Sequence, residues 1–169
     1  MNKTKITIDS EIKQLSGSLN GLIDTLPTYV PKELKELRDI TLNIHRLLET
    51  AMESRIIYGV DKSYGIKTSS MNLPARALRL LSLEPILSNL SFNQKVRIIK
   101  FYNDSENNLV ETLEKANSYR NEFVHPNEYK LKRKFDVNTP KGKQNVRDLL
   151  RCLSKAIKEF NLYFKNYIK

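Results

Sequence analysis

The sequence contains few of the residues that build disulfides and metal centres. Among its 169 residues there are one cysteine, Cys152, and two histidines, His45 and His125. A lone cysteine forms no internal disulfide, which is typical of a reducing compartment. A structural zinc site usually takes four Cys or His ligands, and the sequence shows no cluster of carboxylates or histidines suited to a catalytic metal. We therefore expect a cytoplasmic protein without a metal or another cofactor.

Long apolar runs are also missing. No stretch approaches the ~20 apolar residues of a membrane helix, and no apolar segment follows the first lysines as in a secretory signal. The chain has only five glycines and no alternating apolar–polar run long enough for a strand. Hydrophobic residues make up 40% of the chain, enough for a sizeable core. These features predict no membrane partner and one all-α domain over residues 1–169, a bundle of about five to six helices.

The apolar residues repeat with a helical period along almost the whole chain. We expect helices at about 9–26, 32–58, 74–90 with an interruption at Pro85, 93–102, 105–125 and from Pro140 onward. Thr139 is expected to cap the last helix. Segment 59–73, which is rich in Gly, Ser and Thr, and segment 126–139 are expected to be loops.

Positive charge is in excess and is unevenly placed. The net charge is +10, and from Lys95 onward 17 Lys/Arg stand against 9 Asp/Glu, whereas the residues before it hold 12 against 10. These counts give +8 for the second part and +2 for the first. A one-sided basic excess points to a polyanionic partner, such as nucleic acid or an anionic membrane surface. The alternative is ordinary solubility charge.

Arg120 is the first candidate site residue. It lies in phase with the predicted buried face of helix 105–125, whose apolar members are Leu109, Leu113, Ala116 and Phe123. A guanidinium among apolar side chains is costly unless it is paired or faces a cleft. The alternative to a functional site is a structural pair with a buried carboxylate, for example Glu53 or Glu106.

His125 is the second candidate. Pro126 follows it and disfavours helical geometry, so His125 is predicted to end the helix, where the helix dipole favours the imidazolium form. It could serve only to terminate the helix. Five residues turn a helix about 140° beyond one full turn, so Arg120 and His125 of one chain do not face each other squarely. A second copy of this helix, packed across a two-fold axis, could complete the site.

Two further polar residues fall on the predicted helix 32–58. His45 lies at the margin of its apolar face, which favours a packing role. Arg55 lies in phase with the buried face, where it could either support the site or form an internal pair.

The segment Arg-Asn-x-x-x-His, RNEFVH at 120–125, resembles the Arg-x4–6-His motif of the HEPN domain family. Residues 90–100, LSFNQKVRIIK, are similar to the helix that precedes this motif, so the specific resemblance covers about 90–126. Active HEPN proteins are dimeric, metal-independent endoribonucleases that serve as toxins or antiphage-defence effectors. The resemblance implies that His125 acts as general base or acid at the RNA 2′-hydroxyl or the leaving oxygen. It also implies that Arg120 binds the scissile phosphate and that Asn121 orients the phosphate or His125.

The chain departs from one group in that family. HEPN toxins controlled by nucleotidyltransferase antitoxins carry a modifiable tyrosine two residues after the histidine, and here that position is Asn127. The resemblance leaves room for an antitoxin or a defence-system partner of another kind. Some HEPN-like proteins do not cut RNA, so a catalytically inert module that binds RNA or protein stays the alternative. A basic helical scaffold without a nucleic-acid role is a third possibility.

The segment after the motif is basic with interleaved aromatic residues. Its candidate RNA-binding residues are Tyr129, Lys130, Lys132, Arg133 and Lys134. Basic groups bind phosphates and aromatic rings stack on unpaired bases. The alternative is a solvated loop.

Overall fold

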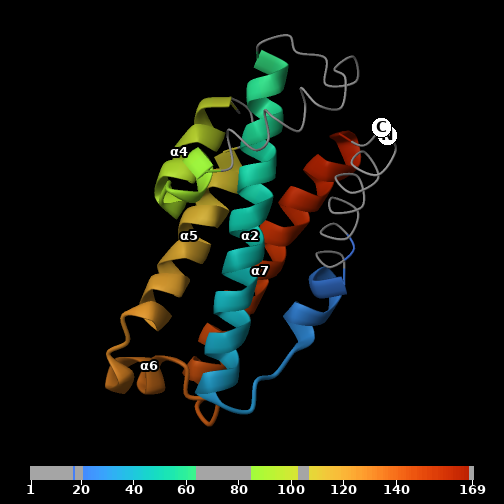
Figure 1. Ribbon diagram of the computed structural model, residues 1–169. Helices are drawn as coiled ribbons and strands as arrows, with labels where there is room; N and C mark the ends of the chain where they lie inside the picture. Colours follow the sequence, from blue (N-terminus) through green and yellow to red (C-terminus); the bar gives the residue numbers. More distant parts are fainter. Residues whose placement is uncertain (1–16, 18–20, 64–84, 103–106, 168–169) are drawn as a thin grey trace, which may run out of the picture.

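The computed structural model describes residues 17, 21–63, 85–102 and 107–167, and within these residues the chain forms helices and no strand. The two longest helices, α2 (Leu34–Ser63) and α7 (Pro140–Tyr167), run side by side. Helix α5 (Asn107–Val124) packs against both, and α4 (Phe92–Tyr102) packs against α2 and α5 (Figure 1). The predicted all-α helical bundle is confirmed.

Two short elements complete the described part of the chain. The 3-10 turn η1 (Leu26–Thr28) lies against α7, and helix α6 (Glu128–Lys134) connects the end of α5 to the start of α7. None of the described helices is long and apolar enough to cross a membrane.

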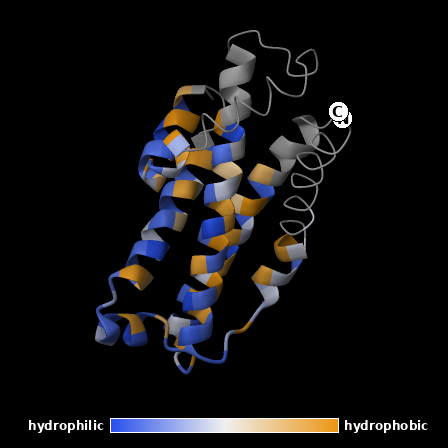
Figure 2. Cartoon of the chain, viewed as in Figure 1, coloured by the Kyte–Doolittle hydropathy of each residue, from blue (hydrophilic) through white to orange (hydrophobic). Residues whose placement is uncertain are grey.

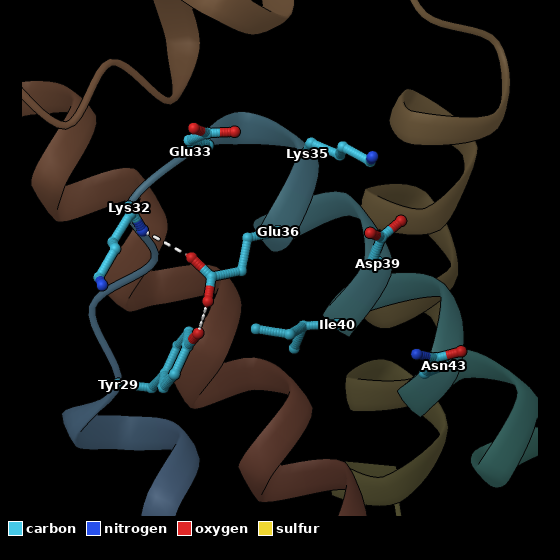
Figure 3. A pocket seen from close by; sticks show the side chains of 8 residues that line it. All are labelled: Tyr29, Lys32, Glu33, Lys35, Glu36, Asp39, Ile40 and Asn43. Atoms are coloured by element: carbon cyan, nitrogen blue, oxygen red, sulfur yellow. Dashed lines mark hydrogen bonds between the residues drawn. The ribbon is translucent and has the colours of Figure 1, made fainter.

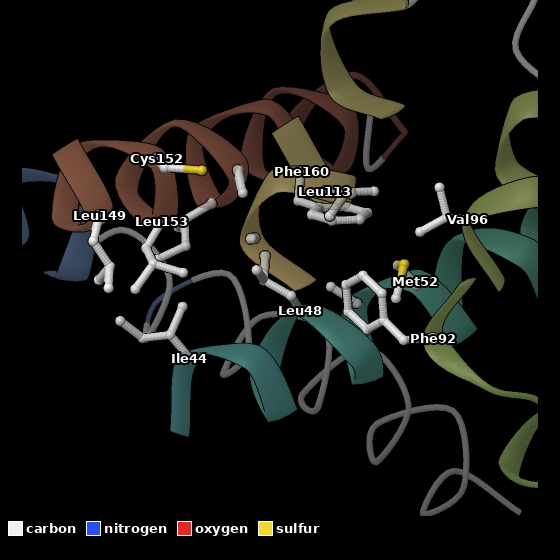
Figure 4. Packing of buried hydrophobic residues seen from close by; sticks show 14 of the residues in the cluster. Ile44, Leu48, Met52, Phe92, Val96, Leu113, Leu149, Cys152, Leu153 and Phe160 are labelled. Atoms are coloured by element: carbon white, nitrogen blue, oxygen red, sulfur yellow. The ribbon is translucent and has the colours of Figure 1, made fainter. Parts of the chain in front are cut away.

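The core lies where the apolar stripes of the four main helices meet. The stripe predicted on α5 is confirmed, since Leu109, Leu113, Ala116 and Phe123 are each 0% exposed. In Figure 4, side chains from α2, α4 and α7 gather around Leu113. Figure 2 shows hydrophobic residues between the helices and hydrophilic residues on their outer sides. Burying each large apolar side chain contributes about 1.5–3 kcal/mol, so this shared core is the main force that orders the bundle.

Two predicted loops are partly wrong. Helix α2 continues to Ser63, through the first five residues of the predicted loop 59–73. One glycine, Gly59, costs a helix only about 1 kcal/mol, and no proline interrupts this stretch. The remainder of that loop lies outside the described residues.

The predicted loop 126–139 contains helix α6. The Asn127 side chain accepts a hydrogen bond from the Lys130 backbone N–H at 3.1 Å and caps the helix. Leu131 and Phe135, four positions apart, are buried and fasten it to the core, and Phe135 stacks on Phe123 with ring centroids 5.4 Å apart. In the sequence these two apolar residues stand among many charged residues, so a helical apolar pattern was not recognised there.

The corner between α6 and α7 is tightly built. Thr139 caps α7 as predicted, because its Oγ1 accepts the Gly142 backbone N–H at 3.0 Å. Gly142 packs so closely against Asp136 that a Cβ there would collide with the Asp136 backbone. The Asn145 amide donates to the Lys134 backbone oxygen at 2.6 Å. These contacts hold α6 in a set position beside α7.

The other predicted helices agree where they are described. The predicted helix 93–102 begins at Phe92, and the predicted helix 105–125 spans 107–124, with 105–106 outside the described residues. Of the predicted helix 9–26, residues 17 and 21–25 are helical, while 9–16 and 18–20 lie outside the described residues. Of the predicted helix 74–90, residues 85–88 are helical, and 74–84 lie outside.

Candidate functional site

A polar network, buried at His45 and Asn117 and exposed at Asn93, joins three helices beside Arg120. The His45 Nε2 atom on α2 lies 3.1 Å from the Asn117 Oδ1 atom on α5. The Asn117 amide nitrogen in turn donates to the Asn93 Oδ1 atom on α4 at 2.8 Å. Asn117 and Arg120 are three residues apart, so they share one face of α5. The network therefore links α2, α4 and α5 at a point about one helical turn from Arg120.

Arg120 lies half-buried near the end of α5. Its Nη1 atom donates a hydrogen bond to the Asn121 Oδ1 atom at 3.0 Å. Among the described residues it forms no ion pair with a carboxylate; Glu53, one predicted partner, binds Lys95 instead. The other, Glu106, lies outside the described residues. Within the described ranges, therefore, no carboxylate pairs with the positive charge of the Arg120 guanidinium.

His45 is buried in the core, more deeply than its predicted position at the margin of the apolar face. It is 6% exposed and stacks on Phe92 with ring centroids 4.2 Å apart. Burial lowers its pKa, and the positive charges of Arg120 and Lys95 lower it further, against the opposing effects of the Asn117 hydrogen bond and Glu49. The imidazole is therefore held neutral. Since Asn117 donates its amide hydrogen to Asn93, its Oδ1 is the acceptor and His45 Nε2 carries the hydrogen.

Lys95 on α4 is buried and forms a second polar cluster with two partly exposed carboxylates of α2. Its side chain is 1% exposed, and its Nζ lies 2.7 Å from carboxylate oxygens of both Glu49 and Glu53. Burial disfavours the ammonium ion, but the two carboxylates outweigh this effect and raise the pKa of Lys95. Sequence reasoning missed this cluster, although Glu49 and Glu53 at i and i+4 on one helix were a visible signal.

His125 lies exposed just after the end of α5. Its backbone N–H still donates to the Asn121 carbonyl at 3.1 Å, so its Cα is fixed by the last helical turn. Within the described part of the chain, its side chain makes no hydrogen bond or ion pair. The structure places Arg120, Asn121 and His125 within one and a half turns, and it shows no contact between the Arg120 and His125 side chains of the same chain.

The candidate RNA-binding residues lie on helix α6 and divide into two groups. Lys130, Lys132 and Arg133 are exposed, and Tyr129 is 75% exposed. Lys134 instead binds Glu122 on α5, with 2.7 Å between its Nζ and the carboxylate oxygen. The charge of Lys134 is therefore compensated within the chain.

Two other predicted or prominent features lie apart from this site. Arg55 is 4% exposed, and its guanidinium carbon lies 6.0 Å from the centre of the Phe160 ring on α7, so it is an internal residue of the α2–α7 packing. A surface hollow of about 400 Å³ at the start of α2 holds Glu36, which accepts hydrogen bonds from the Tyr29 hydroxyl and from the Lys32 backbone at 2.7 Å (Figure 3). These bonds anchor the chain where it enters α2.

No group of three or more His, Cys, Asp or Glu side chains able to hold a metal occurs in the described ranges. Comparison of the chain with models of known families, with curated proteins and with solved structures found no match.

Proposed function

We propose that the protein is a metal-independent endoribonuclease of the HEPN type that acts in the cytoplasm as a toxin or an antiphage-defence effector. The observation that carries the proposal is the state of Arg120. It is half-buried at the end of α5, held by Asn121, and without a carboxylate partner among the described residues. A guanidinium in this state is suited to bind an anion of planar or tetrahedral oxygens, such as a phosphate.

The chemistry follows from what each side chain can supply. Arg120 binds the scissile phosphate and stabilises the charge that develops on its oxygens. His125, exposed and without a partner in the described chain, removes the proton of the substrate 2′-hydroxyl, whose oxygen then attacks the phosphorus. The bond between the phosphorus and the 5′-oxygen breaks, and that oxygen takes a proton from the protonated His125 or from water. The products are a 2′,3′-cyclic phosphate and a 5′-hydroxyl.

Asn121 acts as a positioning residue for Arg120 in this proposal. Its Oδ1 accepts one guanidinium hydrogen at 3.0 Å, which restricts the orientation of the planar group. His125 has no such support within the described chain, and five helical residues offset its position from that of Arg120 by about 140° around the axis of α5. We therefore propose a homodimer in which the α5 helices of two copies border one cleft. An antitoxin or another defence protein would control it.

The test compares purified wild-type protein with Arg120→Ala and His125→Ala on total RNA and on defined oligonucleotides. Arg46→Ala is the matched control, because Arg46 is an exposed arginine on α2. Both site variants should lose cleavage, by about 100-fold or more, with unchanged circular dichroism, and Arg46→Ala should cleave normally. Wild-type cleavage by either site variant would remove that residue from the mechanism.

A catalytically inert HEPN-like module that binds RNA or protein is the second candidate. The observation that favours it is the His125 side chain, which no described group orients for proton transfer. Intact RNA after incubation with excess wild-type protein, together with measurable RNA binding, would establish this candidate over the first.

A further inference from the structure

The outer side of α7 carries a line of cations that has no role in the proposed catalytic mechanism. Four exposed Lys and Arg residues follow one another at intervals of four, four and three positions. They are Arg147, Arg151, Lys155 and Lys158, together called the α7 stripe. At 100° per residue the four fall within a sector of about 80°, and they span about 16 Å along the helix. In the described part of the chain none of them forms an ion pair.

A fifth cation faces the stripe from the neighbouring helix. Lys115 on α5 lines a groove of about 290 Å³ together with Arg151 and Lys155. The Cys152 thiol at this groove is buried, which raises its pKa, and the charges of Lys115 and Lys155 partly oppose that effect. The two lysines therefore lie close enough to the same point to act on it together.

The acidic groups beside the stripe do not cancel it. Glu111 and Asp148 line the same groove, and the half-buried Glu159 follows Lys155 by four positions, so the five cations and three carboxylates leave a local charge of +2. Asp148 already accepts a hydrogen bond from Gln144 at 2.9 Å. Like charges three or four positions apart on a helix repel one another, and a bound anion would offset this repulsion.

We infer that the α7 stripe, with Lys115, binds the phosphodiester backbone of a nucleic acid strand. The cations recur about every 6 Å along a straight helix, so they present a linear set of contacts rather than a single anion pocket. That the strand is RNA rests on the proposed function. The start of α7 is tied to α6 through Asn145 and Lys134, so the exposed cations of α6 lie at the same end of the bundle as Arg147.

An anionic membrane surface fits this face less well. Interfacial helices insert an apolar face between lipids, whereas the apolar face of α7, as far as its side chains are described, is buried in the core, where Leu149, Leu153 and Phe160 are each 0% exposed. None of the large exposed hydrophobic residues of the described chain lies on α7. Phosphate binding needs only the charges, which are exposed.

The experiment measures binding of a fluorescein-labelled single-stranded oligonucleotide with 2′-O-methyl nucleotides, which leaves no nucleophile for cleavage. The variant carries Gln at the four stripe positions. The matched control carries Gln at four other exposed cations, Lys32 just before α2 and Lys35, Arg38 and Arg46 on α2, and so loses the same charge. Anisotropy titrations at several salt concentrations give the affinity and its salt slope, and circular dichroism checks the fold.

Each phosphate contact on a single strand contributes about −0.7 to the slope of log affinity against log salt. We expect the stripe variant to flatten the slope by roughly 1.5–3 and to bind at least about tenfold more weakly at low salt, with the control close to wild type. Equal loss in both variants would show a general charge effect and would overturn the inference. Undetectable oligonucleotide binding by the wild type would also overturn it. So would a stripe variant that binds the oligonucleotide like wild type but no longer binds phosphatidylserine vesicles in a sedimentation assay. Cleavage is read separately, so binding without cleavage rejects only the proposed nuclease.

Discussion

The His45 Nε2 atom on α2 donates to the Asn117 Oδ1 atom on α5 across 3.1 Å, although 72 positions separate the two residues in the sequence. This bond lies one helical turn from Arg120. It places a neutral, buried imidazole beside the guanidinium that we propose binds the scissile phosphate. The stability of the helix end that carries Arg120 and His125 should therefore depend on the protonation state of His45.

The first prediction concerns that dependence on pH. The folded-state pKa of His45 is lowered, so the unfolded chain binds a proton first as the pH falls. The stabilisation from neutral His45 is complete above the unfolded pKa of about 6.5 and is lost as the pH drops toward the folded pKa. Urea unfolding between about pH 7 and pH 5 should show a free energy that falls by up to about 1.4 kcal/mol per pH unit.

The control for this prediction uses the other histidine. His45→Gln should reduce the pH dependence in this window, at some cost in overall stability, while His125→Gln should leave it in place. If His125→Gln removed the slope and His45→Gln did not, the buried neutral imidazole would be the wrong explanation.

The second prediction concerns the Lys95 cluster. Lys95→Ala removes the cation from two carboxylates at 2.7 Å and leaves a cavity. Breaking a buried ion pair costs about 3–5 kcal/mol, and because Glu49 and Glu53 are partly exposed we expect about 2–4 kcal/mol. Lys95→Met combined with Glu49→Gln and Glu53→Gln should recover part of the loss. Chemical denaturation measures both variants, and an unaffected Lys95→Ala variant would contradict the buried cluster.

The third prediction concerns metal ions and the nucleophile. If the substrate 2′-hydroxyl attacks the phosphorus, cleavage should persist in EDTA and should stop where the nucleotide before the scissile bond is deoxy. Gel electrophoresis of a defined RNA and its single-deoxy counterpart measures both effects. Activity that EDTA abolishes and magnesium restores would exclude the proposed mechanism.

The fourth prediction concerns the composite cleft. In a two-fold dimer whose sites pair Arg120 of one chain with His125 of the other, mixing the inactive Arg120→Ala and His125→Ala proteins should restore cleavage. Each mixed dimer then contains one complete site and one site without either group. Light scattering should show a dimer at the same concentrations. Full wild-type activity from a strict monomer would reject the shared cleft.

The fifth prediction concerns helix α6. Replacing Lys130, Lys132 and Arg133 with Gln should weaken RNA binding and flatten the salt slope by roughly 0.7 per lost contact. Lys134→Gln should affect the fold more than RNA binding, because Lys134 binds Glu122. Tyr129→Ala should cost about 1–3 kcal/mol of binding if the exposed ring stacks on a base, with little change in slope. An unchanged triple variant would show that these cations are only solvated.

The sequence by itself determined the helical class, the buried face of α5, the place of Arg120 near that face, and the Thr139 cap of α7. These depend on local period and local hydrogen bonding, which act over one or two helical turns. The stop at His125 follows for the same reason, because Pro126 acts on the residue directly before it.

Only the tertiary structure decided which polar residues meet. Asn93, His45 and Asn117 belong to three helices, and no local pattern links them. Helix α6 forms because Leu131 and Phe135 are buried in the core. Their burial stabilises a segment that otherwise consists mainly of charged residues. Likewise Lys134 differs from Lys130 because folding brings Glu122 beside it. The physical reason is that the energy of a buried polar or charged group depends on its partners, and folding alone brings those partners together.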